Sequence, residues 1–237
     1  MSLQRFLGDD PAPREGALRA LDPEQVRHLR ALRLAPGEAV ELLLPAGAWR
    51  AEVAEVDRGR AVLRLVAPLE EDREAPHPVT VFLPVTAQIS LVDDMIPPVV
   101  ELGASHIQPV FFTRSEGDLR RCVARMDRWR RILEGAAQQS HRSRLPALHE
   151  PASMGVLLAC PAPQKWVAFE GPRDQPNPPL LRAPIALASG PEGGITDEEM
   201  EALEAAGWNP VNLGKSILRA VTAPTALLGA VRFGWEG

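Results

Sequence analysis

The sequence predicts an α/β protein with a mostly parallel sheet, preceded by a small, separate β-barrel. Two patterns lead to this prediction. Residues 38–66 contain three short segments in which apolar and polar side chains alternate, with Gly or Pro between them and no helical pattern. From residue 79 onward, short apolar strand patterns instead alternate with helical patterns. That alternation is typical of a parallel sheet covered by helices on both faces.

The barrel strands are followed by a segment of different character. The three strands are expected at residues 38–45, 49–56 and 60–66. Residues 67–78 are acidic, contain proline and have no periodicity, so they are interpreted as a linker. The sequence therefore predicts a domain boundary near residue 70, with one domain at 1–70 and a second at 71–237.

The second domain is expected to alternate strands and helices. Its strand candidates are residues 79–85, 107–112, 166–170, 184–189 and 209–214. Helices are expected at 118–140 and 196–206, and a helix-like segment ends at Gly103. In that segment, Pro97 and Pro98 remove two backbone donors and should kink or break a helix. The last helix should begin near Thr222 as its cap, because Pro224 is tolerated only in a first turn.

One apolar stripe marks the clearest helix, 118–140. Its members recur at spacings of three and four: Leu119, Cys122, Met126, Trp129, Leu133 and Ala136. Trp129 is interpreted as a core residue rather than a platform for a nucleic-acid base, and Cys122 as a small core residue.

The composition excludes several classes of protein. With two cysteines and no CxxC pair among 237 residues, no disulfide framework is expected, which favours a reducing cytoplasm. The N-terminus has no apolar signal region, and no apolar stretch approaches the ~20 residues of a membrane span. The net charge of −5 argues against a uniformly basic nucleic-acid binder. Yet only two of the 26 basic residues are lysine. That preference has two explanations: a GC-rich genome, or Arg contacts with phosphates and bases.

The stretch "ASGPEGGITDEE" (188–199) resembles a phosphate-binding loop at first sight. It lacks the Lys and hydroxyl of a Walker loop, and its glycines at 190, 193 and 194 do not fit the dinucleotide fingerprint. Thr196 and Glu199 form a capping box, so a helix starts there with three acidic residues that would repel phosphate. The loop is therefore either a simple turn or one wall of a pocket for an uncharged or zwitterionic ligand.

A second glycine loop makes the pocket the more specific interpretation. "NLGKSILRAVTA" (212–223) again follows a strand with Gly and then a helix. The two preceding strands are expected to be adjacent, so that the two loops meet at one edge of the sheet, where α/β proteins bind ligands. Open backbone amides and carbonyls there suit an adenosine or a zwitterion.

Together these two loops resemble the paired C-terminal motifs of the bacterial 16S ribosomal RNA uridine-N3 methyltransferases. Further segments agree with that family in order and spacing: "RF" at 5–6, "LRLAPGE" at 32–38, "ELGASHIQPVFFTRS" at 101–115 and "RW..I...AAQQS.R" from 128 to 142. The family belongs to the SPOUT class, whose α/β domain contains a trefoil knot. The resemblance implies a PUA-like N-terminal barrel, S-adenosylmethionine as cofactor, a homodimer packed through the knot, and the small ribosomal subunit as partner.

The resemblance also implies site residues. Cofactor contacts are expected from three loops: Phe169 and Glu170; Ala188, Ser189, Gly190, Pro191, Glu192, Gly193 and Gly194; and Leu213, Gly214, Ile217, Leu218 and Arg219. Arg219 would stabilise the anion left when uracil N3 loses its proton, and Glu192 would take that proton or bind a ribose hydroxyl. Expected RNA contacts are Arg5, Arg33, Arg114 and Arg142. No metal site is expected, because methyl transfer from a sulfonium needs none and no ligand spacing is present.

Three departures from the family pattern support an alternative hypothesis. Val221 stands where the family usually has Glu, and Gln88 and Pro98 stand where it usually has Lys. The alternative is a non-catalytic or repurposed RNA-binding relative that retains the cofactor fold. A nucleoside-triphosphate-binding protein is the third hypothesis, and the acidic helix start at Asp197 argues against it.

Overall fold

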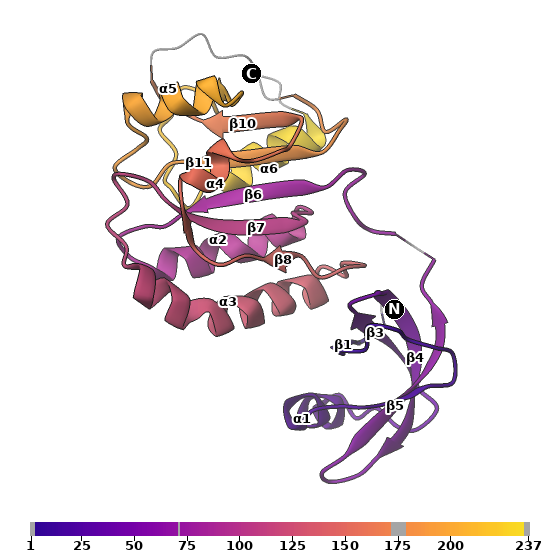
Figure 1. Ribbon diagram of the computed structural model, residues 1–237. Helices are drawn as coiled ribbons and strands as arrows, with labels where there is room; N and C mark the ends of the chain where they lie inside the picture. The colour runs from indigo at the N-terminus through magenta and orange to yellow at the C-terminus, as the bar shows by residue number, and fades with distance from the viewer. Residues whose placement is uncertain (1–2, 71, 172–178, 235–237) are drawn as a thin grey trace. The chain divides into compact units, whose positions relative to one another are not determined.

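The computed structural model describes residues 3–70, 72–171 and 179–234, and it divides the chain into two compact units. The first unit contains residues 1–74 together with 137–145, and the second contains 75–136 together with 146–237. Figure 1 labels the helices and strands of both units.

The first unit is built on a curled five-stranded sheet. Its strands are β1 (Arg5–Leu7), β2 (Leu18–Ala20), β3 (Ala39–Leu44), β4 (Gly47–Val56) and β5 (Ala61–Pro68). The strand order is β1-β3-β4-β5-β2, and only the β1–β3 pair is parallel. Two register shifts in the β4–β5 ladder, between Arg50 and Ala51 and between Val53 and Glu55, favour a strongly bent pair. The three strands expected from alternation are β3, β4 and β5.

A helix that the alternation pattern did not predict covers this sheet. Helix α1 (Pro23–Ala31) buries Val26 and Leu29 in the same core as Phe6 and Leu42. A local signal was present: Asp22 caps the helix, Gln25 completes a capping box, and Pro occupies the first turn.

The segment after the long helix completes the first unit through buried ion pairs. The Arg5 side chain is 3% exposed; its Nε donates to Glu41 Oε2 at 2.8 Å, and its guanidinium also donates to the Arg142 carbonyl. Arg142 is likewise 3% exposed, and its Nε lies 3.0 and 2.9 Å from the two carboxylate oxygens of Glu74. Residues far apart in sequence are thus joined by charge inside one unit.

The second unit contains a sheet in which all the described strand pairs are parallel, as the sequence predicts. Its strands are β6 (Val79–Pro84), β7 (His106–Phe111), β8 (Ala147–Leu148), β9 (Ala152–Ser153), β10 (Gln164–Ala168), β11 (Ile185–Ser189) and β12 (Asn209–Val211). The order is β12-β10-β11-β6-β7-β8, with β9 also paired to β7. Every residue of β11 is buried, as expected for an interior strand of a parallel sheet.

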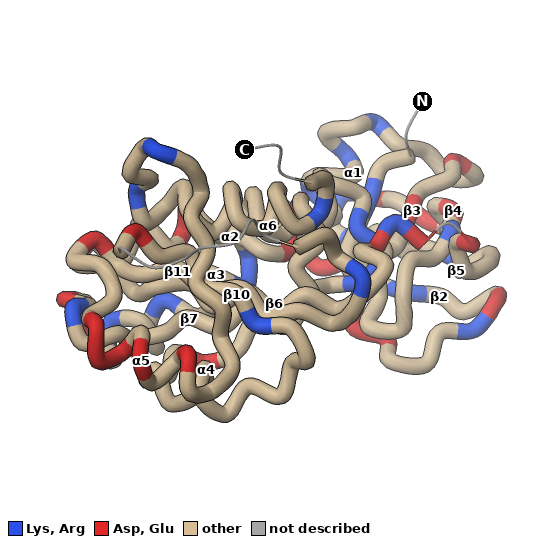
Figure 2. Tube along the Cα trace, turned by 90° about the horizontal axis from the view of Figure 1, so that it is seen from above, with Lys and Arg blue, Asp and Glu red and all other residues tan. Residues whose placement is uncertain are grey.

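Helices cover both faces of this sheet, as Figure 2 shows from above. Helices α2 (Ser90–Glu101) and α6 (Ala223–Phe233) lie on one face, and α4 (Gly155–Leu158) and α5 (Asp197–Ala205) on the other. On the second face, Leu157 of α4 and Met200 and Leu203 of α5 pack into one core with Phe82 and Val167. In the described part of the chain, no helix is both long enough and apolar enough to cross a membrane.

The long helix α3 (Leu119–Gln139) confirms most of the predicted stripe. Cys122, Met126, Trp129 and Leu133 are buried, whereas Leu119, the first residue of the helix, is 52% exposed. Burial raises the pKa of the Cys122 thiol to about 11, and the carboxylate of Asp118 adds to the effect, so this thiol is an inert core group.

Of the two outcomes expected at Pro97 and Pro98, a kink or a break, the break does not occur. Helix α2 runs continuously from Ser90 to Glu101 with both prolines inside it. Its buried side chains explain why: Met95, Ile96 and Val99 have no exposed surface, so packing holds the helix despite two missing donors. The predicted start of the last helix is confirmed, since Thr222 is the N-cap of α6 and proline lies in its first turn.

Candidate active site

Three loops of the second unit meet because of the strand order. Strands β12, β10 and β11 are neighbours and run parallel, so their carboxyl ends lie at one edge of the sheet. The loops that leave them begin at Asn212, Phe169 and Gly190 respectively. The expectation that the strands before the two glycine loops are adjacent was wrong: β10 lies between β11 and β12. This arrangement brings a third loop, at 169–171, into the same site.

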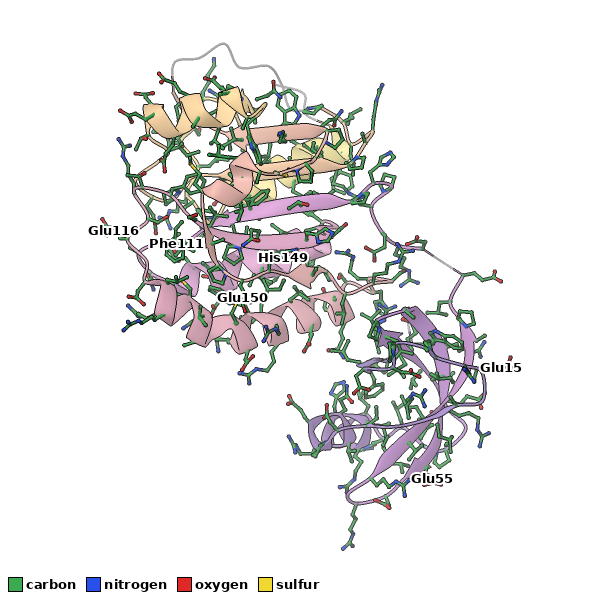
Figure 3. All side chains as sticks on the ribbon, in the orientation of Figure 1. Glu15, Glu55, Phe111, Glu116, His149 and Glu150 are labelled. Atoms are coloured by element: carbon green, nitrogen blue, oxygen red, sulfur yellow. The ribbon has the colours of Figure 1, made fainter. Side chains whose placement is uncertain are left out.

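These loops line a pocket of about 820 Å³, large enough for a nucleotide-sized ligand. Its lining includes five charged side chains: Arg114, Glu170, Glu192, Lys215 and Arg219. Three are cationic and two anionic, so the pocket is suited to a ligand that carries both signs of charge. Figure 3 shows these loops with their side chains as sticks, at the ends of the strands.

The glycine loop after β11 is compact because two of its glycines have no space for a side chain. A Cβ on Gly190 would lie 2.8 Å from Ile195 Cγ1 and 3.2 Å from its backbone nitrogen. A Cβ on Gly193 would lie 2.9 Å from Arg114 Cβ. The loop thus folds back on itself and packs against the loop after β7, and any side chain at 190 or 193 would displace it.

The helix that follows begins as predicted. Thr196 is the N-cap of α5, its side chain accepts from the Glu199 amide at 3.1 Å, and Glu199 Oε2 accepts from the Thr196 amide at 3.0 Å. The first turn carries Asp197, Glu198 and Glu199. These carboxylates already face the positive end of the helix, so the helix start does not form an anion site.

The loop after β7 is bound at two points, one in the glycine loop and one in the first turn of helix α5. Glu199 Oε1 accepts from the Thr113 amide at 2.6 Å, and Arg114 Nη1 donates to the Gly193 carbonyl at 2.8 Å. Figure 3 labels Phe111 and Glu116, which flank this segment. An arginine that sequence reasoning assigned to RNA binding thus lies at the wall of the pocket.

The loop after β12 offers unpaired backbone groups to the pocket. Within the described residues, the amides of 213–218 donate no hydrogen bond to another protein group. Gly214 has a φ of +104°, a conformation that L side chains rarely adopt. Ile217 is 81% exposed. This loop therefore presents backbone donors that have no hydrogen-bond partner within the protein, together with an exposed apolar side chain.

Most of the residues expected to contact a cofactor line this one pocket. They are Phe169, Glu170, Gly190, Pro191, Glu192, Gly193, Gly194, Leu213, Gly214, Ile217, Leu218 and Arg219. Ala188 and Ser189 do not line it: they end β11 and are buried behind the loop, 2% and 1% exposed. Both expected catalytic side chains, Arg219 and Glu192, are exposed on the pocket wall.

The four arginines expected to bind RNA have different environments. Arg114 and Arg33 are exposed, and Arg33 has a φ of +59°. Arg5 and Arg142 are instead buried in the ion pairs of the first unit, so neither guanidinium is available to a phosphate unless those pairs break.

Sequence reasoning missed several lining residues. Asn212, Lys215 and Ser216 belong to the second glycine-loop segment, and their place in that motif was the signal that could have found them. Leu91 lines the pocket from α2, and no local pattern pointed to it. Val221, which stands where the family usually has Glu, also lines the pocket and gives it an apolar side chain at that position.

No cluster of three or more His, Cys, Asp or Glu side chains within residues 3–70, 72–171 and 179–234 is placed to hold a metal ion.

Comparison with known proteins agrees with both units. Residues 73–232 match the family described as an RNA methyltransferase domain, and residues 21–66 match the RNA methyltransferase PUA domain. These matches define the class of protein: an RNA methyltransferase domain of the SPOUT type with a PUA-like domain before it, which confirms the predicted fold class.

Similar proteins named ribosomal RNA small subunit methyltransferase E identify the family within this class. The one from Synechocystis sp. is 36% identical, covering 89% of this chain and 71% of its own length. The one from Mycobacterium bovis is 30% identical over 94% of this chain and 88% of its own. The chain belongs to the family of the ribosomal RNA small subunit methyltransferases E.

Two solved structures have the same fold. The methyltransferase E from Neisseria gonorrhoeae, bound to S-adenosyl methionine, is 28% identical with a TM-score of 0.83, and the match covers 96% of each chain. A putative methyltransferase from Legionella pneumophila, in complex with the same cofactor, has a TM-score of 0.84 at 24% identity. That match covers 98% of this chain and 97% of the other.

Proposed function

We propose that this chain methylates N3 of a uridine in the 16S RNA of the small ribosomal subunit, with S-adenosylmethionine bound in the pocket of the second unit. The observation that carries the proposal is the meeting of three loops, after β10, β11 and β12, around one pocket with charges of both signs. Family membership supports this assignment, because the methyltransferase E from Neisseria gonorrhoeae is bound to S-adenosyl methionine.

The residues present fit this cofactor. Its adenine and its amino-acid part need backbone donors and acceptors, and the unpaired amides of 213–218 supply donors. Its ribose hydroxyls and its ammonium group need acceptors, and Glu170 and Glu192 supply carboxylates that line the same pocket. When bound, S-adenosylmethionine supplies an electrophilic methyl group on a sulfonium.

Two side chains are proposed to act on the acceptor base. Arg219 is exposed on the pocket wall and stays positively charged, so it suits the anion that forms when uracil N3 loses its proton. Glu192 is exposed in the loop after β11. It is the candidate to accept that proton or to bind a ribose hydroxyl.

RNA contacts are proposed at Arg114 and Arg33, which are exposed, and the PUA-like domain at 1–70 is proposed to contribute to RNA binding. Arg5 and Arg142 are left out because both are buried. A homodimer packed through the second unit, and action in the cytoplasm on assembled subunits, complete the proposal.

The proposal is tested with labelled S-adenosylmethionine and unmodified small ribosomal subunits, followed by mass spectrometry of the modified nucleoside. We expect label in 3-methyluridine. Cofactor binding without label transfer would instead support the non-catalytic relative, which the apolar Val221 in the pocket favours. Calorimetry with ATP in place of the cofactor tests the nucleotide-binding hypothesis.

Arg219→Ala should lower the rate of transfer by about a hundredfold or more, the effect of removing one donor to a developing anion. The matched control is Arg182→Ala, an exposed arginine outside the pocket lining, which should keep full activity. Circular dichroism establishes that both variants are folded. Full activity in the Arg219 variant would remove this side chain from the mechanism.

A further inference from the structure

The buried carboxylate of Glu199 is not used by the proposed chemistry, yet it joins the loop at 112–115 to the start of helix α5, just after the glycine loop of the pocket. The residue is 6% exposed. Its Oε1 accepts from the Thr113 amide at 2.6 Å, and its Oε2 accepts from the Thr196 amide at 3.0 Å. Both partners are backbone N–H groups, so the charge is held by amides and by the start of helix α5.

A second connection joins the loop at 112–115 to the glycine loop itself. Arg114 directly follows Thr113, and its Nη1 donates to the Gly193 carbonyl at 2.8 Å. A Cβ on Gly193 would lie 2.9 Å from Arg114 Cβ, so the two backbones are in close contact there. Arg114, Gly193 and Gly194 all line the pocket. Glu199 does not line it, which makes any effect on the ligand an indirect one.

We infer that Glu199 is a positioning residue: it ties the loop at 112–115 to the start of helix α5, which directly follows the glycine loop at 190–194, and so sets the affinity of the pocket and the place of Arg114 at its wall. This inference rests on the proposed function, because the ligand used to test it is S-adenosylmethionine. A carboxylate is required for the link: it has two oxygens that accept from two donors, whereas the amide of a glutamine has one acceptor and one donor group.

Two variants separate positioning from simple stabilisation of the helix. Glu199→Gln keeps the size of the side chain but turns an NH₂ group toward one of the two amides. Thr196→Val also keeps the size and removes the acceptor of the Glu199 amide, 3.1 Å away, but leaves both carboxylate bonds in place. Both variants should lower the Tm, since each removes part of the capping box.

Only Glu199→Gln should change the pocket. We expect its Kd for S-adenosylmethionine, measured by calorimetry, to rise about tenfold, the effect of one lost charge-assisted hydrogen bond. Its KM for the ribosomal substrate should rise as well, because Arg114 loses its support. Thr196→Val should leave both constants unchanged. Equal Kd values for Glu199→Gln and the wild-type chain, or the same change in both variants, would overturn the inference.

Hydrogen exchange on the wild-type chain tests the link without relying on a variant that might not fold. Saturating S-adenosylmethionine should slow exchange of the Thr113 and Thr196 amides, because ligand and link stabilise the same loop arrangement. Unchanged exchange at these two amides contradicts the inference and leaves the proposed function standing. Failure of the wild-type chain to bind the cofactor at all overturns both.

Discussion

Asp93 of helix α2 shows how one buried charge can hold two helices together. Its carboxylate accepts from Arg125 Nε at 2.8 Å, from Arg128 Nε at 2.7 Å and from Trp129 Nε1 at 2.9 Å, all three on α3. Burial by itself would raise the pKa of Asp93, but these three donors outweigh it and lower the pKa to about 2, from an ordinary value of 3.8. The ionised carboxylate of Asp93 is therefore stabilised more strongly in the folded chain than in the unfolded chain.

We expect Asp93 to make stability depend on pH in the acid range. Because the pKa in the folded chain, about 2, lies below the ordinary 3.8, the stabilisation is fully present above pH 3.8. It is lost as the pH falls from there toward 2, and it amounts to roughly 2 kcal/mol. Urea unfolding at a series of pH values measures this slope.

Asp93→Asn is the matched control for that slope. The asparagine has almost the same shape but cannot be ionised, so its stability should fall less steeply with acid in this range. An equal slope in the variant and the wild-type chain would show that other carboxylates account for the acid sensitivity.

Local sequence patterns predicted the environment of some side chains correctly and of others wrongly. Trp129 and Cys122 were expected in the core because the spacing of their stripe already defines a face of the helix. Arg5 and Arg142 were expected to bind RNA because arginine suits phosphate. Their burial depends on Glu41 and Glu74, each more than 30 residues away, and no local pattern reports such a partner.

At the scale of elements, the edge strand β8 is held by few bonds and carries a pair of histidines. Among the described residues β8 pairs only with β7, through Ala147 and Leu148, and the His149 amide donates to the Ile107 carbonyl at 2.9 Å. His106 Nδ1 lies 3.1 Å from His149 Nε2, and the two rings are stacked. Figure 3 labels His149 at this edge.

Acid should loosen this edge. Burial, and to a smaller extent the charge on His149, lower the pKa of His106 below its ordinary 6.5. The folded chain thus favours the neutral ring of His106, and the stabilisation is present above pH 6.5 and lost as the pH falls below it. Hydrogen exchange at the Ala147 and His149 amides, corrected for the intrinsic effect of pH, should show opening of β8 as the pH falls below 6.5. In His149→Gln this added opening should be much smaller.

The elements themselves were predicted where their pattern is local. Alternation located β3 to β5, and the Thr196 capping box located the start of α5. Helix α1 was missed although Asp22, Pro23 and Gln25 carry the same kind of start signal. The break expected at Pro97 and Pro98 did not occur, because tertiary packing of α2 outweighs the two missing donors.

At the scale of the whole molecule, the site depends on strand order. The loops after β10, β11 and β12 come together because β10 lies between the other two, an order that runs against the sequence. Periodicity identifies strands but does not rank them within a sheet, which is why the third loop was expected only from family resemblance. The composition of the first unit could not be predicted from periodicity either. It includes residues 137–145, which follow residues 75–136 of the second unit in the sequence.

That returning segment leads to a prediction about the stability of the first unit. The side chains of Arg142 and Glu74 are 3% and 10% exposed, and the Glu74 carboxylate also accepts from the Ser143 amide at 2.8 Å. Arg142→Met should destabilise this unit by about 3–5 kcal/mol, because it leaves a buried carboxylate without its cation. Native-state hydrogen exchange of the β3 and β4 amides reports the loss.

The double variant Arg142→Met with Glu74→Met distinguishes the ion pair from the packing around it. Removing both charges leaves no unpaired buried carboxylate, so the double variant should be more stable than Arg142→Met alone. Arg144→Met serves as the control on the same segment, since Arg144 pairs with Asp72 at 3.3 Å but its side chain is 65% exposed, and its loss should cost less than about 1 kcal/mol. If the double variant is instead the least stable of the three, the contribution of Arg142 comes from its packed aliphatic stem rather than from its charge.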